Sequence, residues 1–196
     1  RDVAPSRGLG DVYKRQIDDF DRLQDVEALK KGYIQVQDFS SILAGHIPEI
    51  KGGENIIDIC AAPGGKTLHI ADRLNDRKLN GGGKIISCDL TDAKTALIKE
   101  NVERNGFENV SVVKNDALAF KKEWEDTADI VIADLPCSGL GVIGKKCDIK
   151  YKTSIEDINA LSEIQREILK NVSRYLKKGG QLLYSCLLYT SDAADE

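Results

Sequence analysis

The sequence contains no apolar run close to the roughly 20 residues that a membrane-spanning helix needs, so a membrane protein is not expected. Its first residues, RDVAPSRGLG, lack the apolar core of a secretory signal, which argues against export. The five cysteines are odd in number and include no C-x-x-C pair, which argues against a disulfide framework and a zinc site. We therefore expect a cytoplasmic protein with reduced thiols and no metal.

An excess of positive charge is also absent, because the formal net charge is −4. Any contact with nucleic acid would have to come from a local basic patch rather than from the charge of the whole chain. The length of 196 residues and the 41% hydrophobic content suit one globular domain of ordinary size. We expect this domain to be a monomer.

The two ends of the chain differ from its middle. Residues 1–16 show neither helical nor strand periodicity, and the second half of 186–196 is small and acidic. Such tails resemble translated sequencing-adaptor DNA, and we expect both to be non-native; ordinary frayed termini are the alternative. Residues 17–50 are then a lead-in segment, and 51–185 form the main domain, which we expect to be incomplete.

Between the tails, short apolar segments alternate with helical ones. The apolar segments are continuous rather than alternating, which is typical of parallel strands covered on both faces. The sequence predicts helices over 65–74, 93–105 and 158–176, the last one ended by the basic and glycine-rich segment KKGG. This order predicts a doubly wound α/β domain with a mostly parallel sheet. The predicted strands are 55–60, 84–89, 110–114, 129–134 and 181–185.

In such a sheet, ligands bind at the carboxyl ends of the strands, and four of these ends carry polar or glycine residues. Gly64 and Gly65 follow the first strand and allow a sharp turn with close backbone approach. Asp89 ends the second strand, where an acidic residue can accept both ribose hydroxyls of a nucleoside. Asp116, which could accept from an exocyclic amine, follows the third strand, and Asp134 ends the fourth. Together they predict one nucleoside ligand.

Other interpretations of these residues stay open. The glycine pair could be a plain strand-to-helix turn, and Asp89 and Asp116 could be helix caps or turn formers. The letters GGKT suggest a phosphate-binding loop, which needs the pattern Gly-x-x-x-x-Gly-Lys-Thr. The first glycine of that pattern falls on Cys60, and Pro63 removes a backbone donor from the loop. A P-loop nucleotide hydrolase is therefore an alternative, but a weak one.

Three motifs together resemble the Sun-type, RsmB-like RNA cytosine-5 methyltransferases. They are CAAPGGKT after the first strand, the acidic end of the second strand, and DLPCSGLGV after the fourth. The resemblance covers about residues 32–185 and includes the upstream segment YIQVQDFSS. It implies a Rossmann-like, class I S-adenosylmethionine-dependent methyltransferase fold, here expected to be truncated after the fifth strand.

The resemblance also implies which residues bind S-adenosylmethionine. Asp89 would hold the ribose, Asp116 would lie near the adenine, and Asp134 would lie between the cofactor and the target base. The loop around the methionine part of the cofactor would be formed by Cys60, Ala61, Ala62, Pro63, Gly64, Gly65 and Lys66.

The implied reaction is methyl transfer to carbon 5 of a cytosine in RNA, with 16S ribosomal RNA as the expected substrate. A thiolate that adds to carbon 6 of the cytosine makes carbon 5 nucleophilic, and this is covalent catalysis. Asp134 resembles the residue that binds N3 of the base, and Cys137 resembles the cysteine assigned to release of the product. The alternative for Cys137 is a small residue in a tight turn at a proline.

The sequence departs from the family pattern at the attacking cysteine. The family has a segment like Tyr-Ser-Thr-Cys-Thr after the fifth strand, whereas this chain reads YSCLL over 184–188. Cys186 falls at the place of the threonine, and a shift of one residue in a strand turns the side chain to the other face. We therefore do not assign Cys186 as the nucleophile, and we expect the chain to be inactive in methyl transfer.

A basic loop is the expected RNA contact. Its lysines follow the Cys137 turn, near the place where the target base must enter, and phosphate contact is favoured over a merely solvated loop. A non-catalytic module that binds cofactor or RNA remains an alternative to an enzyme. The lysines are Lys145, Lys146, Lys150 and Lys152.

Overall fold

The computed structural model describes residues 25–37, 39–75, 82–136 and 155–186. The chain divides into two compact units, Arg1–Gln35 and Val36–Glu196. In the first unit the short helix α1 (Glu27–Lys30) is followed by a turn in which the Tyr33 amide donates to the Ala28 carbonyl at 2.9 Å. The second unit holds the sheet and the candidate site. None of the described helices is both long and apolar enough to cross a membrane.

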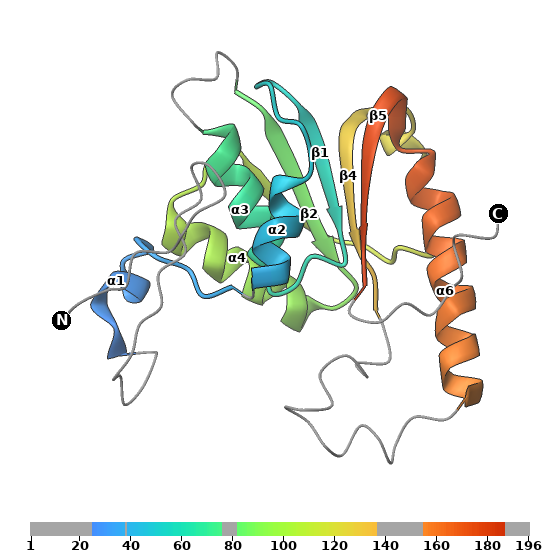
Figure 1. The fold of residues 1–196 in the computed structure, drawn as a ribbon, viewed down its shortest axis with the longest axis horizontal. Helices are drawn as coiled ribbons and strands as arrows, with labels where there is room; N and C mark the ends of the chain where they lie inside the picture. Colours follow the sequence, from blue (N-terminus) through green and yellow to red (C-terminus); the bar gives the residue numbers. More distant parts are fainter. Residues whose placement is uncertain (1–24, 38, 76–81, 137–154, 187–196) are drawn as a thin grey trace. The chain divides into compact units, whose positions relative to one another are not determined.

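The second unit is built on one parallel sheet of five strands in the order β3-β2-β1-β4-β5. Figure 1 shows this sheet between helices on both faces, which confirms the doubly wound α/β fold. The strands are β1 (Asn55–Ile59), β2 (Lys84–Asp89), β3 (Val110–Lys114), β4 (Ala128–Asp134) and β5 (Leu176–Ser185). The other elements are α2 (Phe39–His46), α3 (Gly65–Leu74), α4 (Asp92–Asn105), the 3-10 helix η2 (Lys122–Trp124) and α6 (Ile155–Ser173).

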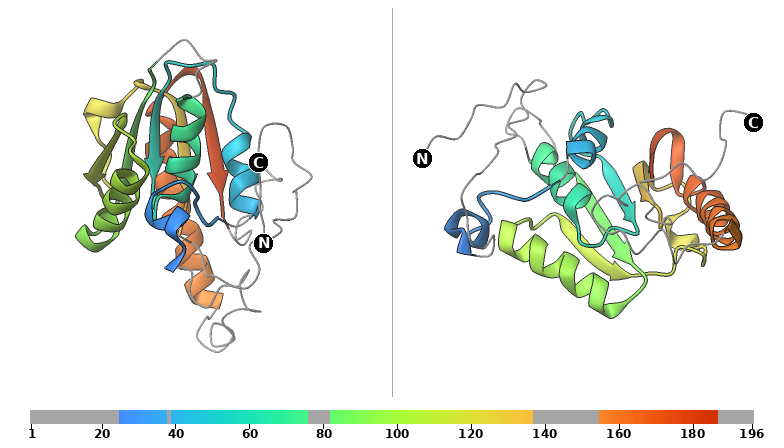
Figure 2. Two further views of the ribbon diagram at one scale, coloured as in Figure 1. Left: turned by 90° about the vertical axis from the view of Figure 1, so that its left-hand side faces the viewer. Right: turned by 60° about the horizontal axis from the view of Figure 1, so that its bottom comes forward.

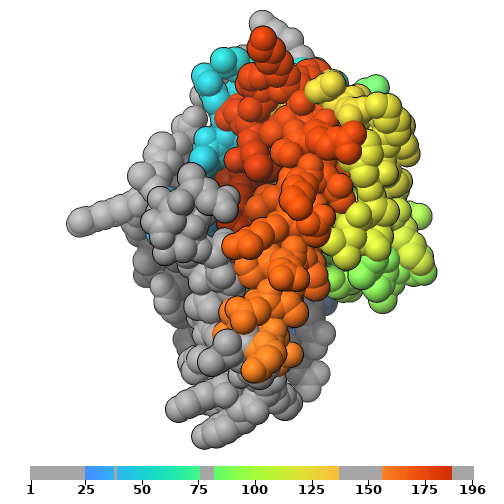
Figure 3. Space-filling view, turned by 90° about the vertical axis from the view of Figure 1, so that its right-hand side faces the viewer, coloured from blue at the N-terminus to red at the C-terminus, as the bar shows by residue number. Residues whose placement is uncertain are grey.

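Alternate residues of the central strands supply the cores of the two faces. Ile56 of β1 packs with Ile70 of α3, while its neighbour Ile57 packs in the cluster that contains Val172 of α6. Helices α2, α3 and α4 therefore lie on one face and α6 on the other, as the right-hand view of Figure 2 shows. In the space-filling view, α6 runs along its face beside the residues that lead from β3 to β4 (Figure 3). Both faces of the central strands are covered, which explains their continuous apolar sequence.

The predicted bounds of the last helix and the predicted start of the last strand are wrong. The segment KKGG was expected to end the last helix, but α6 ends at Ser173 and β5 already begins at Leu176. The buried Tyr175 lies between them, and its carbonyl accepts from the amides of Thr127 and Ala128 at the start of β4. Leu176 therefore already pairs with Ala128 of β4. A register shift follows, because the next pair is Ile130 with Gln181, and the two glycines lie in the irregular part of β5 between these pairs.

A buried glutamine connects α6 with the ends of β4 and β5. Gln165 is 2% exposed, and its Nε2 donates to the carbonyl of Pro136 at 2.8 Å. The Tyr184 hydroxyl donates to Gln165 Oε1 at 3.1 Å, and the Cys186 sulfur lies 3.6 Å from Nε2. One amide thus holds the residues that follow two neighbouring strands.

Replacing Gln165 with leucine should lower the free energy of unfolding by about 2–3 kcal/mol, because it removes buried hydrogen-bond partners from Pro136 and Tyr184. Urea unfolding followed by circular dichroism measures this loss. The matched control is Glu163→Leu on the exposed side of the same helix, which should shift stability by no more than about 0.5 kcal/mol. Equal effects of the two substitutions would show that the buried network contributes nothing.

Candidate functional site

The carboxyl ends of the strands lie in register at one edge of the sheet. Asp89 at the end of β2 pairs with Lys114 of β3, and Asp134 at the end of β4 pairs with Ser185 of β5. Between them, Ile59 at the end of β1 pairs with both neighbouring strands. Parallel pairing therefore brings the sequence-predicted strand ends together along this edge.

The loop over 60–66 turns sharply from β1 into α3. Cys60 has a φ of 59° and Gly64 a φ of 104°, both in the left-handed region. A Cβ on Gly64 would lie 3.5 Å from Cγ2 of Ile98, so the conformation rather than the space requires glycine. The Gly64 amide donates to the carbonyl of Ala61 at 2.7 Å, and α3 begins at Gly65. The loop backbone is thus closely folded at the strand edge.

The carboxylate of Asp89 is buried under this loop. The side chain is 2% exposed, Oδ2 accepts from the Ala62 amide at 3.0 Å, and Oδ1 accepts from the Leu90 amide at 2.7 Å. Lys94 of α4 places its ammonium 3.0 Å from Oδ1. These contacts give Asp89 a role beyond a simple turn former, because its carboxylate joins the end of β2 to the loop over 60–66.

Sequence reasoning missed Lys94, although one signal was available. It lies in the first turn of α4, where the positive end of the helix dipole disfavours a cation. A lysine there needs a nearby anion, and Asp89 precedes it by five residues. The side chain of Lys94 is 53% exposed, so its ammonium stays accessible from solvent.

Asp134 joins the ends of β4 and β5 to the loop. Its Oδ2 accepts from the ammonium of Lys66 at 2.6 Å, and its Oδ1 accepts from the Ser185 hydroxyl at 2.6 Å. The Lys66 side chain is only 12% exposed, whereas that of Asp134 is 40% exposed. The two sequence-predicted residues therefore form one partly buried ion pair, with Asp134 on the open side.

A second carboxyl, Asp58, lies beneath the same loop and was not predicted. It is fully buried, and its Oδ2 accepts from the Thr67 hydroxyl at 2.5 Å, which lies 2.8 Å from the Ser87 hydroxyl. Asp58 Oδ1 has no hydrogen-bond partner among the described residues. Burial raises the pKa of Asp58 to about 7, against the lowering effect of the Thr67 hydrogen bond.

This raised pKa predicts a pH dependence of stability. In the unfolded chain Asp58 ionises near its ordinary value, so between that value and pH ~7 the folded chain binds more protons. The contribution of Asp58 to the free energy of unfolding is fully present below the pKa that this group has in the unfolded chain. It is lost as the pH rises to about 7.

Asp58→Asn keeps the side-chain volume and removes the ionisation, so its thermal midpoint should fall less than that of the original chain between pH 4 and pH 7. Differential scanning fluorimetry across this range measures the difference. Parallel profiles for the two chains would show that Asp58 does not titrate there.

A pocket of about 230 Å³ opens between the loop, Asp58 and Asp134. Loop residues Ala61, Ala62 and Pro63 line it together with Gly65 and Lys66. The remaining lining residues come from before β1 and are Val36, Gln37 and Ser41. The pocket therefore combines an ammonium, two carboxyl groups, an amide and a hydroxyl.

The end of β3 differs in detail from the expectation. Asp116 is exposed, and its Oδ1 accepts from the Leu118 amide at 2.9 Å in a local turn. The preceding Asn115 is 6% exposed, with no partner for Nδ2 among the described residues, and its amide donates to the Asp89 carbonyl at 2.9 Å. The adenine role of Asp116 stays a prediction, and Asn115 is the buried polar side chain at this place.

Cys60 and Cys88 are poor nucleophiles. Burial raises the pKa of the Cys60 thiol to about 12, and burial raises the pKa of Cys88 as well. Both thiols are therefore protonated near neutral pH; Cys88 is buried and Cys60 is partly buried. Cys137 and the four lysines Lys145, Lys146, Lys150 and Lys152 lie outside the described residues. In the described part of the chain, no group of three or more potential ligands could hold a metal ion.

Solved structures show which class of protein has this architecture. The NSun6 protein of Pyrococcus horikoshii, whose crystal structure contains SFG, matches with a TM-score of 0.74 and 31% identity. The match covers 90% of this chain and 44% of that one. The sheet, its order and this match confirm the expected Rossmann-like class I methyltransferase fold.

The family can be stated as well. The model of the family described as 16S rRNA methyltransferase RsmB/F matches residues 47–193. The chain belongs to this family, which confirms the resemblance seen in the motifs. S-adenosylmethionine, which the resemblance implied, is confirmed as the cofactor of this family. These matches give no support to a P-loop nucleotide hydrolase.

Curated relatives agree with the family and are much longer than this chain. The probable ribosomal RNA small subunit methyltransferase B of Bacillus subtilis is 37% identical over 168 residues, which are 85% of this chain and 36% of that protein. The tRNA (cytosine(72)-C(5))-methyltransferase of Pyrococcus horikoshii is 34% identical over 163 residues, or 83% of this chain and 40% of that protein. The chain thus spans about two fifths of the relatives' length or less.

Proposed function

We propose that this chain carries the cofactor-binding and catalytic region of an S-adenosylmethionine-dependent RNA cytosine-5 methyltransferase. The observation that carries the proposal is the buried carboxylate of Asp89, which holds the Ala62 amide at the carboxyl edge of the sheet. This contact supports the proposal, because a carboxylate at the end of the second strand, next to a closely folded glycine loop, can accept from ribose hydroxyls. Residues 51–185 then form the methyltransferase domain, and 17–50 lead into it.

The residues of the edge fit the cofactor in a defined order. Asp89 binds the ribose, and the end of β3, with Asp116 and the buried Asn115, lies toward the adenine. The loop from Cys60 to Lys66 surrounds the methionine part, beside the pocket lined by Lys66 and Asp134. When bound, S-adenosylmethionine supplies an electrophilic methyl group on a sulfonium sulfur.

The protein must make carbon 5 of cytosine nucleophilic. A cysteine thiolate forms a bond to carbon 6, and the electrons of the 5,6 double bond then become available at carbon 5 for the bond to methyl. A base removes the proton from carbon 5, the double bond forms again and the thiolate leaves. Asp134, with the Lys66 ammonium 2.6 Å from its Oδ2, binds or protonates N3 and so favours the addition. Cys137 serves the release step.

RNA is the substrate class that the family supports, and small-subunit ribosomal RNA is the substrate we propose. The phosphate contacts are assigned to Lys145, Lys146, Lys150 and Lys152, and the chain acts as a monomer. Because the chain as a whole carries net negative charge, binding should depend on this patch and weaken steeply with salt.

Isothermal titration calorimetry tests the cofactor part of the proposal directly. S-adenosylhomocysteine should bind this chain without any change to it, because Asp89, the loop and the pocket are all formed in the folded protein. ATP with magnesium should not bind, since Lys66 is paired with Asp134 and Pro63 lacks a backbone donor. Binding of ATP with magnesium and not of S-adenosylhomocysteine would reverse the assignment.

A further inference from the structure

Part of the wall of the pocket is formed by a segment that precedes the sheet in the sequence. Val36, Gln37 and Ser41 line it, and Ser41 lies in the first turn of α2. These residues belong to the same compact unit as the sheet, which begins at Val36. The lead-in segment therefore takes part in the site rather than merely connecting to it.

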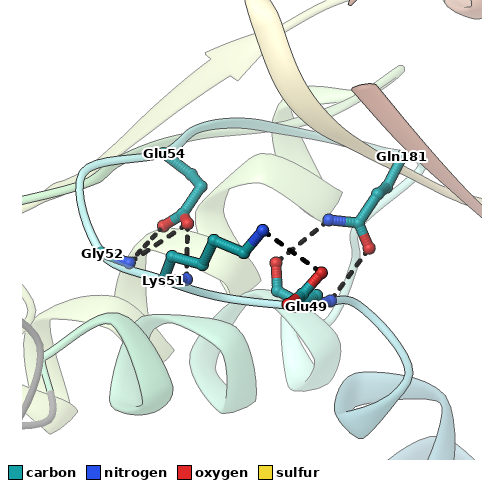
Figure 4. A network of polar contacts seen from close by, with 5 residues as sticks. All are labelled: Glu49, Lys51, Gly52, Glu54 and Gln181. Atoms are coloured by element: carbon teal, nitrogen blue, oxygen red, sulfur yellow. Dashed lines mark hydrogen bonds and ion pairs between the residues drawn. The ribbon is translucent and has the colours of Figure 1, made fainter. Parts of the chain in front are cut away.

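Specific contacts fix this segment on the rest of the unit. The side chain of Gln181 in β5 binds the backbone of Glu49 at both ends: Oε1 accepts from the Glu49 amide at 2.9 Å, and Nε2 donates to its carbonyl at 3.0 Å. Figure 4 shows this pair beside Glu54, whose carboxylate accepts from the amides of Lys51 and Gly52. The connection from α2 to β1 is thus held at two places.

Helix α2 itself packs closely on α3. The guanidinium of Arg73 donates to the Gly45 carbonyl at 2.7 Å. A Cβ on Gly45 would lie only 2.6 Å from the ring of His69, so this crossing requires glycine at that position. His69 in turn contacts the ring of His46 edge-on, with centroids 4.7 Å apart. The helix that follows Gln37 in the sequence is therefore firmly docked on α3.

Gln37 has an unused donor at this pocket. Its Nε2 is buried, with no hydrogen-bond partner among the described residues. A buried donor without a partner is unfavourable, and a ligand that accepts a hydrogen bond from it removes this cost. Lys66, whose ammonium is paired with Asp134, and the start of α3 at Gly65 supply further donors at this pocket, so a ligand group with several acceptor oxygens fits there.

We propose that Gln37 is a specificity-determining residue that donates from Nε2 to the α-carboxylate of the cofactor's amino-acid end. This inference rests on the proposed function: with the ribose at Asp89, the amino-acid end extends along the loop into the pocket that Gln37 lines. The lead-in segment then distinguishes a complete cofactor from a nucleoside that lacks the amino acid.

The test compares two ligands on two variants. S-adenosylhomocysteine carries the amino-acid end, and 5′-methylthioadenosine lacks it. By calorimetry, Gln37→Leu should weaken S-adenosylhomocysteine at least about tenfold, since it removes a hydrogen bond to a charged group, and leave 5′-methylthioadenosine unchanged. Gln37→Glu should weaken S-adenosylhomocysteine further, because two carboxylates would face each other. Ser40→Ala, an exposed change in the first turn of α2, should alter neither affinity.

The outcomes separate this inference from the proposed function. If the original chain does not bind S-adenosylhomocysteine, the proposed function fails. If it binds and Gln37→Leu binds both ligands as the original chain does, only the assignment of Gln37 is overturned. An equal loss for both ligands also overturns it, because Gln37 would then act through the structure of the pocket; thermal unfolding of each variant identifies that case.

Discussion

Replacing Asp89 with alanine is expected to weaken the binding of S-adenosylhomocysteine about 10- to 100-fold. The substitution removes a charge-assisted acceptor, whose loss typically costs about 1.5–3 kcal/mol. It also releases the Ala62 amide from the end of β2, so the loop loses part of its support. Calorimetry with the original chain and the variant measures the ratio of the two dissociation constants.

Two further variants separate the roles of Asp89. Asp89→Asn keeps an oxygen for the Ala62 amide but loses the ion pair with Lys94, so its affinity should lie between those of the original chain and Asp89→Ala. Asp92→Ala is the matched control, since Asp92 lies in the same region, is 85% exposed on its side chain and pairs with Lys114. Equal affinity of Asp89→Ala and the original chain would remove Asp89 from the binding site.

The sequence was sufficient to predict the sheet because its central strands are buried on both faces. Continuous apolar segments such as NIIDIC and DIVIAD are typical of buried parallel strands. The order of strands and helices then allows only a small set of topologies. The start of β5 could not be predicted in this way. It depends on the buried Tyr175, whose carbonyl pairs with Thr127 and Ala128 far away in the sequence. The segment KKGG resembles a local helix stop, but the contact of Tyr175 with β4 ends the helix earlier and places KKGG in the strand.

In the candidate site too, some residues were predictable from the local sequence and others depend on tertiary contacts. Asp89 and Asp134 were predictable, because each follows an apolar run at the edge where parallel strands place their ligands. Asp58 was not predictable, since its burial depends on Ser87 lying opposite it in the register and on Thr67 reaching it from α3. The place of Gln37 at the pocket was not predictable either, because it precedes the sheet in the sequence and reaches the pocket only through tertiary packing.

The structure gives a physical reason to expect that Cys186 is not placed for attack. Ser185 faces Asp134, to which its hydroxyl donates at 2.6 Å, whereas the sulfur of Cys186 lies 3.6 Å from Gln165 of α6. Neighbouring side chains of an extended chain point to opposite faces, so Ser185 and Cys186 face different sides. The family pattern Tyr-Ser-Thr-Cys-Thr puts its cysteine one position after the one that Cys186 occupies.

We therefore predict no methyl transfer to RNA by the original chain, and transfer by the double variant Cys186→Thr/Leu187→Cys. The expected gain is at least about 1,000-fold over background, because without the addition to carbon 6 the acceptor carbon is never activated. Incorporation of a radiolabelled methyl group into 16S ribosomal RNA measures it. Both chains should bind S-adenosylhomocysteine equally, which makes the original chain a control for cofactor binding.

Further variants of these two chains test the order of the covalent steps. Cys186→Thr alone should remain inactive, since it provides no thiol at either position. In the double variant, the further change Cys137→Ala should leave the addition to carbon 6 intact and block release, so a covalent RNA–protein adduct should accumulate on a denaturing gel. Methylation by the original chain, lost in Cys186→Ala, would instead make Cys186 the nucleophile and contradict the one-residue shift from which this prediction follows.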